Sequence, residues 1–405
     1  MKIGIIGAGL AGLSCAVYLK KNGVEDITIF ESSDQVGGKL RTDIVGNYQL
    51  DRGFQVLLPS YPETKALLDY SKLELQYFEK GSIIFNGSKV IPFFDPANGL
   101  IPLIKTVLNG PGSLIDKLKL LKLKNTLSNL TVDEIFSNPQ KMSSISYLKQ
   151  LGFSTKIINE FWLPFYQGVF LENDLTTDFK MLQFTFKMFS DKGAAVPKLG
   201  MQAIPNQLAA TIGLDKIKLN DSVLHFDNKS ITSTDGTVHT FDKVVLACNL
   251  NQHITYHSVT NIYFEAASLP INSKNVMLNA NENRLVNNVV FISNIASNYA
   301  KSGKYLISVS ANGIHHDLGL IIKDLNQMFG SQVNNWNLVK TYIIKEALPL
   351  VDLAQKPQIV NKQGVYCCSD FLIQGSINGA IKSGRLAAEQ ILNCRARSST
   401  SSLKN

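Results

Sequence analysis

Cysteine is scarce in this chain, and its spacing excludes two classes of protein. The five cysteines are Cys15, Cys248, Cys367, Cys368 and Cys394, and no two of them form a Cys-x-x-Cys pair. This odd count without a framework argues against a disulfide-stapled secreted scaffold and against a cysteine-based zinc site. We therefore expect a reducing compartment, the cytoplasm, and we expect the adjacent Cys367 and Cys368 to pack in a core.

Arginine is also scarce, although the chain is basic. Only six of the 40 basic residues are arginine, and the formal net charge is +8. Proteins that read nucleic acids favour arginine, because its guanidinium can make two hydrogen bonds to one base. We expect no nucleic-acid partner. The lysine excess fits a solvated surface, and an anionic membrane or substrate is the alternative.

Long apolar runs, metal motifs and several enzyme motifs are missing. No apolar run approaches the roughly 20 residues that a membrane-spanning helix needs. His253 and His257 lie four residues apart without a third ligand, so we expect no metal site. The chain also has no GxSxG, no P-loop and no second GxGxxG motif. A separate NAD(P)H-binding domain is therefore not expected.

The N-terminal residues form a complete βαβ pattern. A β-branched strand over Lys2–Ile6 is followed by a glycine turn at residues 7–12 and by a helix over Leu13–Asn22. A second apolar strand, Ile27–Phe30, ends at Glu31. A GxGxxG turn between a strand and a helix, with an acidic residue about 20 positions further on, is typical of dinucleotide binding.

Each part of this pattern has a physical role. Gly7 allows the tight turn, Gly9 lets the backbone approach a pyrophosphate, and Gly12 lets helix and strand pack closely. The helix N-terminus offers free N–H groups to phosphates. Glu31 suits ribose hydroxyls and disfavours a 2′-phosphate, and hence NADP. The predicted turn contacts are Gly7, Ala8, Gly9, Leu10, Ala11 and Gly12.

The next residues narrow the choice of dinucleotide. Gly37-Gly38-Lys39-Leu40-Arg41 follows Glu31, and two glycines with an arginine suit a second phosphate contact. This extension resembles that of the flavin-containing amine oxidase superfamily, which includes monoamine and polyamine oxidases, protoporphyrinogen oxidase and phytoene desaturases. The resemblance covers residues 1–63, 100–250 and 340–392 by motif. It implies FAD, with contacts from Gly37, Gly38, Lys39, Leu40 and Arg41.

The C-terminal part resembles the same family. A buried strand is expected over Gly364–Cys368, and a helix opens after Gln374 and runs to about Leu392. By resemblance, Asp370 binds the ribityl chain, and the helix dipole faces the flavin N1–C2=O edge. The family usually has a glycine before this aspartate, whereas this chain has Ser369. The implied contacts are Ser369, Asp370, Ser376, Ile377, Asn378 and Ala380.

A β-meander is expected over residues 218–247, with Asp235-Gly236 as its hairpin turn. The resemblance implies that this meander supplies the adenosine-side strand, with the Val223 backbone against adenine. An ordinary core role for Val223 stays open. The remaining cofactor contacts implied by the resemblance are Ser32, Gly53, Phe54 and Ala247.

Two segments are candidates for substrate contact. Phe161–Phe170 is the most aromatic stretch, and it suits an apolar pocket as well as a core. The expected substrate contacts are Gln55, Phe165, Tyr166 and Met201. A basic amphipathic helix within residues 100–127, with its apolar face at Leu114, Leu118 and Leu121, either packs over the cavity or rests on an anionic membrane.

These observations predict an α/β fold. An FAD-binding Rossmann-type domain in three segments, 1–75, 196–250 and 350–394, alternates with a mixed α+β substrate domain. The substrate domain is expected over residues 76–195 and 251–349, and the serine-rich residues 395–405 are expected to be a disordered tail.

The expected function is oxidation of an organic substrate. FAD would take a hydride from a C–H bond of an amine or an apolar small molecule and pass the electrons to oxygen or a quinone. Two alternatives stay open: a membrane-associated desaturase or isomerase of a polyene or tetrapyrrole, and a non-catalytic flavin-binding protein. The expected location is cytoplasmic, with contact to the inner membrane face left open.

Overall fold

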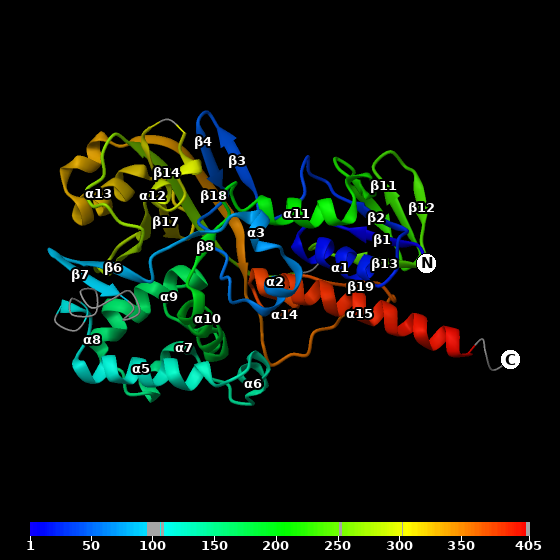
Figure 1. The fold of residues 1–405 in the computed structure, drawn as a ribbon, viewed down its shortest axis with the longest axis horizontal. Coiled ribbons are helices and arrows are strands. Elements are labelled where there is room, and N and C mark those ends of the chain that lie inside the picture. Colours follow the sequence, from blue (N-terminus) through cyan, green and yellow to red (C-terminus); the bar gives the residue numbers. More distant parts are fainter. Residues whose placement is uncertain (95–105, 107–108, 251–252, 302, 402–405) are drawn as a thin grey trace.

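The computed structural model describes residues 1–94, 106, 109–250, 253–301 and 303–401. The described residues form two large sheets, which lie on opposite sides of the molecule (Figure 1). One sheet collects strands from the N-terminal, middle and C-terminal parts of the sequence. The other is built mainly from residues 256–349, with one hairpin from residues 81–94.

The first sheet has five parallel strands in the order β19-β13-β1-β2-β9. Its strands are β1 Ile3–Ile6, β2 Ile27–Phe30, β9 Ile217–Lys218, β13 Lys243–Leu246 and β19 Tyr366–Cys367. β1 is fully buried, as expected for a central parallel strand covered on both faces. The carboxyl ends of β1, β2 and β13 therefore meet at one edge of the sheet.

Three helices cover this sheet: α1 Leu10–Lys21, α11 Ala203–Ile212 and α15 Ile377–Ser401. α1 and α15 lie side by side although more than 350 residues separate them (Figure 1). A Cβ at Gly384 would lie 2.3 Å from the Ala11 carbonyl oxygen, so this glycine permits the close approach. The N-terminal and C-terminal parts of the cofactor motif are thereby held together.

The second sheet has seven strands in the order β18-β14-β17-β16-β15-β6-β7. Its strands are β6 Gly81–Asn86, β7 Lys89–Phe94, β14 Tyr256–Ala266, β15 Val276–Asn279, β16 Val286–Val290, β17 Tyr305–Asn312 and β18 Asn337–Pro349. Side chains alternate between its faces. Ile307 and Val309 face the cluster that contains helix α13 (Leu318–Phe329), whereas Ser310 faces a cavity.

A layer of helices lies beside the second sheet (Figure 1). It comprises α5 Leu114–Ser128, α6 Val132–Ser137, α7 Ser144–Gln150, α8 Thr155–Ile157, a π-helical turn Ile158–Trp162, α9 Leu163–Phe170 and α10 Phe179–Lys192. An aromatic cluster around Trp162 joins these helices, because the rings of Phe153, Phe161 and Phe186 all lie within 5.3 Å of it.

Small elements connect the large ones. The short helices are α2 Pro62–Leu67, α3 Tyr70–Leu73, α12 Ile292–Ile295, α14 Asp370–Ile373 and the 3-10 turns Leu214–Lys216, Ser297–Tyr299 and Ser331–Asn335. The short strands are β3 Thr42–Val45, β4 Tyr48–Asp51, β5 Gln76–Tyr77, β8 Ala195–Val196, β10 Val223–Phe226, β11 Ser230–Ser233 and β12 Val238–Thr240.

Three local predictions need correction. α1 begins at Leu10, not Leu13, because the second half of the glycine motif already forms its first turn. The meander expected over residues 218–247 forms a sheet of only three strands, β10, β11 and β12, since the last strand of the segment, β13, joins the parallel sheet instead. α15 continues to Ser401, so part of the expected disordered tail is helical; residues 402–405 lie outside the described residues.

The basic helix also differs from its prediction. Residues 100–105 and 107–108 lie outside the described residues, and α5 begins at Leu114 behind a capping box of Ser113 and Asp116. Leu123 and Leu127 are buried, whereas Leu114, Leu118 and Leu121 are about half to two-thirds exposed. Of the two expectations for this apolar face, packing over the cavity therefore does not hold for Leu114, Leu118 and Leu121, and contact with a membrane stays a proposal.

Candidate functional site

A large cavity connects the two sheets. Its volume is about 1530 Å³, and its lining runs from the glycine turn after β1 to the polar face of the seven-stranded sheet. Ligand pockets usually occupy roughly 300–1,000 Å³. The cavity therefore has room for a dinucleotide and a second molecule next to it.

The glycine turn forms one end of this cavity. Gly7, Gly9, Leu10 and Ala11 line it, and among the described residues no side chain caps the N-terminus of α1. A Cβ added at Gly9 would have no atom within 4 Å, so this position faces open space. Uncapped N–H groups at a helix N-terminus attract phosphate oxygens. This end thus fits a diphosphate without obstruction.

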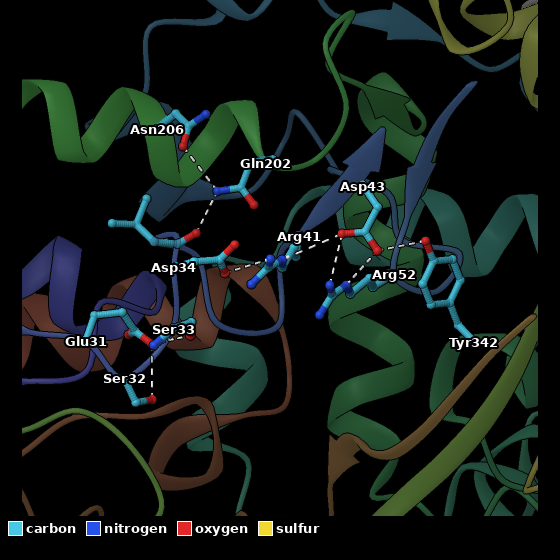
Figure 2. A network of polar contacts seen from close by, with 11 residues as sticks. Glu31, Ser32, Ser33, Asp34, Arg41, Asp43, Arg52, Gln202, Asn206 and Tyr342 are labelled. Carbon is cyan, nitrogen blue, oxygen red and sulfur yellow. Dashed lines mark hydrogen bonds and ion pairs between the residues drawn. The ribbon is translucent and has the colours of Figure 1, made fainter. Parts of the chain in front are cut away.

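Glu31 stands at the end of β2, next to the glycine turn. Its carboxylate accepts a hydrogen bond from the Ala8 backbone N–H at 2.7 Å. It also accepts hydrogen bonds from the Ser33 N–H and hydroxyl (Figure 2). Glu31 is only 7% exposed but lines the cavity. These bonds fix the carboxylate where ribose hydroxyls of a dinucleotide would bind.

The C-terminal segment closes the same end of the cavity. Lys39 Nζ lies 2.7 Å from Asp370 Oδ2, which joins the second glycine segment to the start of α14. Ser369, Asp370, Ser376 and Ile377 all line the cavity. The acid and the start of α15 therefore stand beside the same end of the cavity as the glycine turn.

A charged network leads from this end toward the second sheet. Asp43 lies between Arg41 and Arg52, and it accepts a hydrogen bond from Tyr342 Oη at 2.9 Å (Figure 2). Burial alone would raise the pKa of Asp43, but the hydrogen bonds from Arg52 and Tyr342 outweigh it and lower the pKa. Asp43 is thus a stable anion that ties β3 to β18.

Most of the predicted cofactor residues line the cavity. They are Gly7, Gly9, Leu10, Ala11, Glu31, Ser32, Gly37, Gly38, Lys39, Leu40, Gly53, Phe54, Val223, Ala247, Ser369, Asp370, Ser376, Ile377 and Ala380. This brings together segments from all three parts of the sequence. Their direct contact with a cofactor stays a prediction.

Four predicted cofactor residues do not line the cavity. Ala8 acts through its N–H to Glu31, and Gly12 sits behind the turn, where a Cβ would lie 2.1 Å from the Gly7 carbonyl oxygen. Arg41 pairs with Asp34 at 2.8 Å. Asn378 is 1% exposed, and its Oδ1 accepts the Glu63 backbone N–H. These residues shape the site from behind its surface.

The predicted substrate contacts also divide into residues that line the cavity and residues that do not. Gln55 and Phe165 line the cavity. Tyr166 does not, because it is fully buried and its hydroxyl bonds to the Leu182 carbonyl. Met201 is also fully buried, and its backbone N–H donates to Asp51.

The sequence prediction missed much of the second half of the cavity. Its lining includes Val169, Glu172, Met181, Phe189, Val276, Leu278, Asn288, Ser310, Tyr342 and Ile344. One pattern could have indicated part of it. β16 is a buried strand with two consecutive asparagines, Asn287 and Asn288, and buried amides need partners.

Two chemistries find no support in the site. Cys248 lines the cavity, but burial and the nearby Glu31 charge raise its pKa to about 12, so its thiol stays protonated. Over the described ranges, no three His, Cys, Asp or Glu side chains gather in a way that could hold a metal ion. Nor do the described helices include one long and apolar enough to cross a bilayer.

Comparison with known proteins identifies the class of this site. The model of the flavin-containing amine oxidoreductase family matches residues 10–392. The chain therefore belongs to this family, which confirms the expected fold, the FAD cofactor and the flavin-dependent oxidoreductase class. The uncapped helix, the open space at Gly9 and the fixed Glu31 carboxylate fit that cofactor.

Individual relatives are more distant. The chain is 28% identical to protoporphyrinogen oxidase 2 of Arabidopsis thaliana over 41% of this chain and 32% of that protein. It is 23% identical to 1-hydroxycarotenoid 3,4-desaturase of Flavobacterium sp. (strain P99-3), over 63% of this chain and 57% of that protein. These two matches therefore span only 32% and 57% of the length of the curated relatives.

Solved structures share the whole fold. Putrescine oxidase bound to putrescine matches with a TM-score of 0.71 at 16% identity, covering 97% of this chain and 99% of that one. An oxidoreductase from Methanosarcina mazei matches with a TM-score of 0.70 at 16% identity, covering 96% of this chain and 100% of that one. At this identity the likeness establishes the fold.

Proposed function

We propose that this protein oxidises a C–H bond of a small organic substrate, most simply an amine, and that oxygen or a quinone takes up the electrons. Bound FAD supplies the two-electron acceptor. The observation that carries the proposal is the continuity of one cavity from the dinucleotide end into a chamber beside the second sheet. A substrate in that chamber has direct access to the cofactor end.

The chain's own residues position and shield the substrate. Phe165, Val169, Met181, Phe189 and Ile344 supply apolar walls. Such walls exclude water and hold the substrate in one orientation, which hydride transfer needs more than it needs a general base. The division into cofactor and substrate domains, with the boundaries predicted above, stays part of this proposal.

One buried carboxylate supports an amine substrate. Glu172 is 7% exposed, lines the cavity and accepts hydrogen bonds from Thr176 Oγ1 and the Thr177 N–H. Within the part of the chain that the structure describes, no lysine, arginine or histidine pairs with it. A buried carboxylate without a cation attracts one. A protonated amine meets that need on binding, and it must release an N–H proton before its C–H hydride can leave.

The proposal is tested by anaerobic reduction. Alkyl monoamines and diamines would be mixed one at a time with oxidised holoprotein, and flavin absorbance near 450 nm would be followed. We expect at least one amine to bleach it, and then oxygen or a quinone to restore it. Glu172→Gln should weaken this bleaching, whereas exposed Glu282→Gln should not. If no amine bleaches the flavin, the proposed substrate class is wrong.

We also propose that α5 rests on an anionic membrane surface. Leu114, Ile115 and Leu118 are between 62% and 66% exposed, and Leu121 is 48% exposed. Lys117, Lys119, Lys122 and Lys124 lie on the same helix. Exposed leucines next to lysines suit insertion at the level of anionic headgroups. This contact would be peripheral.

A further inference from the structure

We infer that the substrate carries a second hydrogen-bond donor, an N–H or O–H group, which is received by the Asn288 Oδ1 atom on β16. This inference deepens the proposed function and rests on it for the use of the cavity as the substrate chamber. It assigns a specificity-determining role to Asn288. It also excludes a pure hydrocarbon as the preferred substrate.

A polar row crosses the cavity face of the seven-stranded sheet. Asn288 on β16 pairs in register with Ser310 on β17, Ser310 with Asn261 on β14, and Asn261 with Tyr342 on β18. Directly paired residues on neighbouring strands point to the same face. Asn288, Ser310 and Tyr342 all line the cavity. The row therefore leads from the charged network at Asp43 into the apolar chamber.

Neighbouring groups fix the orientation of the Asn288 amide. Asn287 Nδ2 donates to the Pro164 carbonyl oxygen at 3.1 Å, which leaves Asn287 Oδ1 as an acceptor. Asn288 Nδ2 donates to that Oδ1 at 2.8 Å. The chain of bonds assigns the Nδ2 end of the Asn288 amide to Asn287 and leaves the Oδ1 end without a partner among the described residues.

The free Oδ1 atom is buried without a partner. Asn288 is only 5% exposed, and its Oδ1 accepts no hydrogen bond from any residue that the structure describes. A buried acceptor left unsatisfied costs roughly 1–3 kcal/mol. The Oδ1 atom has almost no accessible surface, but the Asn288 side chain lines the cavity, so a ligand donor that reaches Oδ1 through a small local shift would recover that cost. The same argument gives discrimination against ligands that lack a donor.

Gly168 on α9 makes room for this arrangement. A Cβ at Gly168 would lie 2.4 Å from Asn287 Oδ1 and 2.9 Å from Asn288 Nδ2. Any larger residue would therefore displace the asparagine pair. Gly168→Ala thus disturbs the acceptor without changing either asparagine, which gives a second way to test the inference.

Isothermal titration of the chemically reduced holoenzyme, under anaerobic conditions, separates binding from turnover. The probes are hexylamine, which has no distal donor, 6-aminohexan-1-ol, with a distal O–H, and 1,6-diaminohexane, with a distal N–H. We expect at least one of the two donor-bearing probes to bind wild type about tenfold more tightly than hexylamine. The two probes also distinguish a hydroxyl from an amine.

Asn288→Leu and Gly168→Ala should each reduce that preference to within about twofold and leave hexylamine affinity unchanged. The matched control is Asn279→Leu, a buried asparagine on neighbouring β15 that does not line the cavity. It should keep the preference. The inference is overturned if wild type shows no preference, if no probe binds, if both variants retain the preference, or if the control also loses it.

Different outcomes contradict the proposed amine oxidation and the proposed donor site at Asn288. If the preference depends on Asn288 but no amine bleaches the oxidised flavin, the donor site stands and the proposed reaction is wrong. If amines bleach the flavin but Asn288→Leu and Gly168→Ala bind all three probes as wild type does, the reaction stands and the donor site is wrong.

Discussion

Gly9 and Gly12, two residues of the same glycine motif, have different physical roles. Gly9 has ordinary backbone angles, φ −72° and ψ 176°, and open space at its Cβ position, so Gly9→Ala should fold normally. Its methyl group would occupy the place expected for the diphosphate. We predict at least a tenfold loss of FAD affinity with unchanged thermal stability of the apoprotein, measured by fluorescence titration and calorimetry. Unchanged FAD affinity would contradict this placement.

The Gly12→Ala variant gives the contrasting result. Its Cβ would lie 2.1 Å from the Gly7 carbonyl oxygen and 3.0 Å from the Ala247 Cβ, so the backbone must move. Apoprotein stability and FAD affinity should therefore fall together. The pair of variants thus separates the glycine that faces the ligand from the glycine that packs helix against strand.

Asp51 makes stability depend on pH. It accepts hydrogen bonds from Thr42 Oγ1, the Met201 N–H and Tyr299 Oη, and burial raises its pKa to about 6. In the unfolded chain its pKa would be about 3.9. Because the pKa of Asp51 is higher in the folded protein than in the unfolded chain, the protonated Asp51 carboxyl stabilises the folded state. This contribution is full below about pH 4 and is lost as the pH rises through about 6.

The Asp51→Asn variant tests this linkage. The stability of wild type relative to Asp51→Asn should fall between pH 4.5 and pH 7.5, as measured by thermal unfolding at each pH. Asp215→Asn, at a side chain that is 78% exposed, is the control and should show no such trend. A constant difference between wild type and Asp51→Asn would show that the carboxyl does not titrate in this range.

At the scale of elements, one ion pair joins α2 to α15. Arg385 donates two hydrogen bonds to Glu63, at 2.9 and 2.7 Å, and Glu63 is only 8% exposed. Arg385→Ala would leave a buried carboxylate unpaired, so we predict a loss of about 2 kcal/mol in the free energy of unfolding. Lys382→Ala on the same helix should cost well under 1 kcal/mol. Its partner, Asp133, is 92% exposed at the side chain. Equal losses would refute the distinction.

The exposed face of α5 leads to a prediction about binding to lipid vesicles. Wild type should co-sediment with vesicles that contain phosphatidylserine, less in high salt, and Leu114→Ser with Leu118→Ser should abolish sedimentation. Leu199→Ser, at a leucine that is 60% exposed elsewhere, is the control. If the protein stays in the supernatant at low salt, α5 does not bind lipid.

The same helix shows what periodicity could not settle. Its leucine spacing indicated one apolar face, but tertiary packing buried Leu123 and Leu127 instead of Leu114 and Leu118. α15 shows a second limit, since its extent to Ser401 exceeds the predicted end near Leu392. Serine has only a moderately lower helix propensity than the best helix formers, so a serine-rich composition does not by itself predict where a helix ends.

At the scale of the whole molecule, the predicted residues that lie together at one end of the cavity are those fixed by local backbone chemistry, and their contact with FAD stays a prediction. The glycine turn, Glu31 and the acid at Asp370 have fixed positions relative to short buried strands, so their spacing carries the geometry. The substrate half depends on which face of a helix or strand meets the other domain. Tyr166 and Asn288 show this, since the first lies behind the wall and the second forms it.

The visible absorption spectrum of the purified protein, followed by release and identification of its cofactor, tests the central claim most directly. The account predicts a yellow protein with one FAD per chain, because Gly7, Gly9, Glu31 and Asp370 line one cavity. Reconstitution with FAD should give the same result if the cofactor is lost in purification. A colourless protein that also fails to bind added FAD would contradict the account.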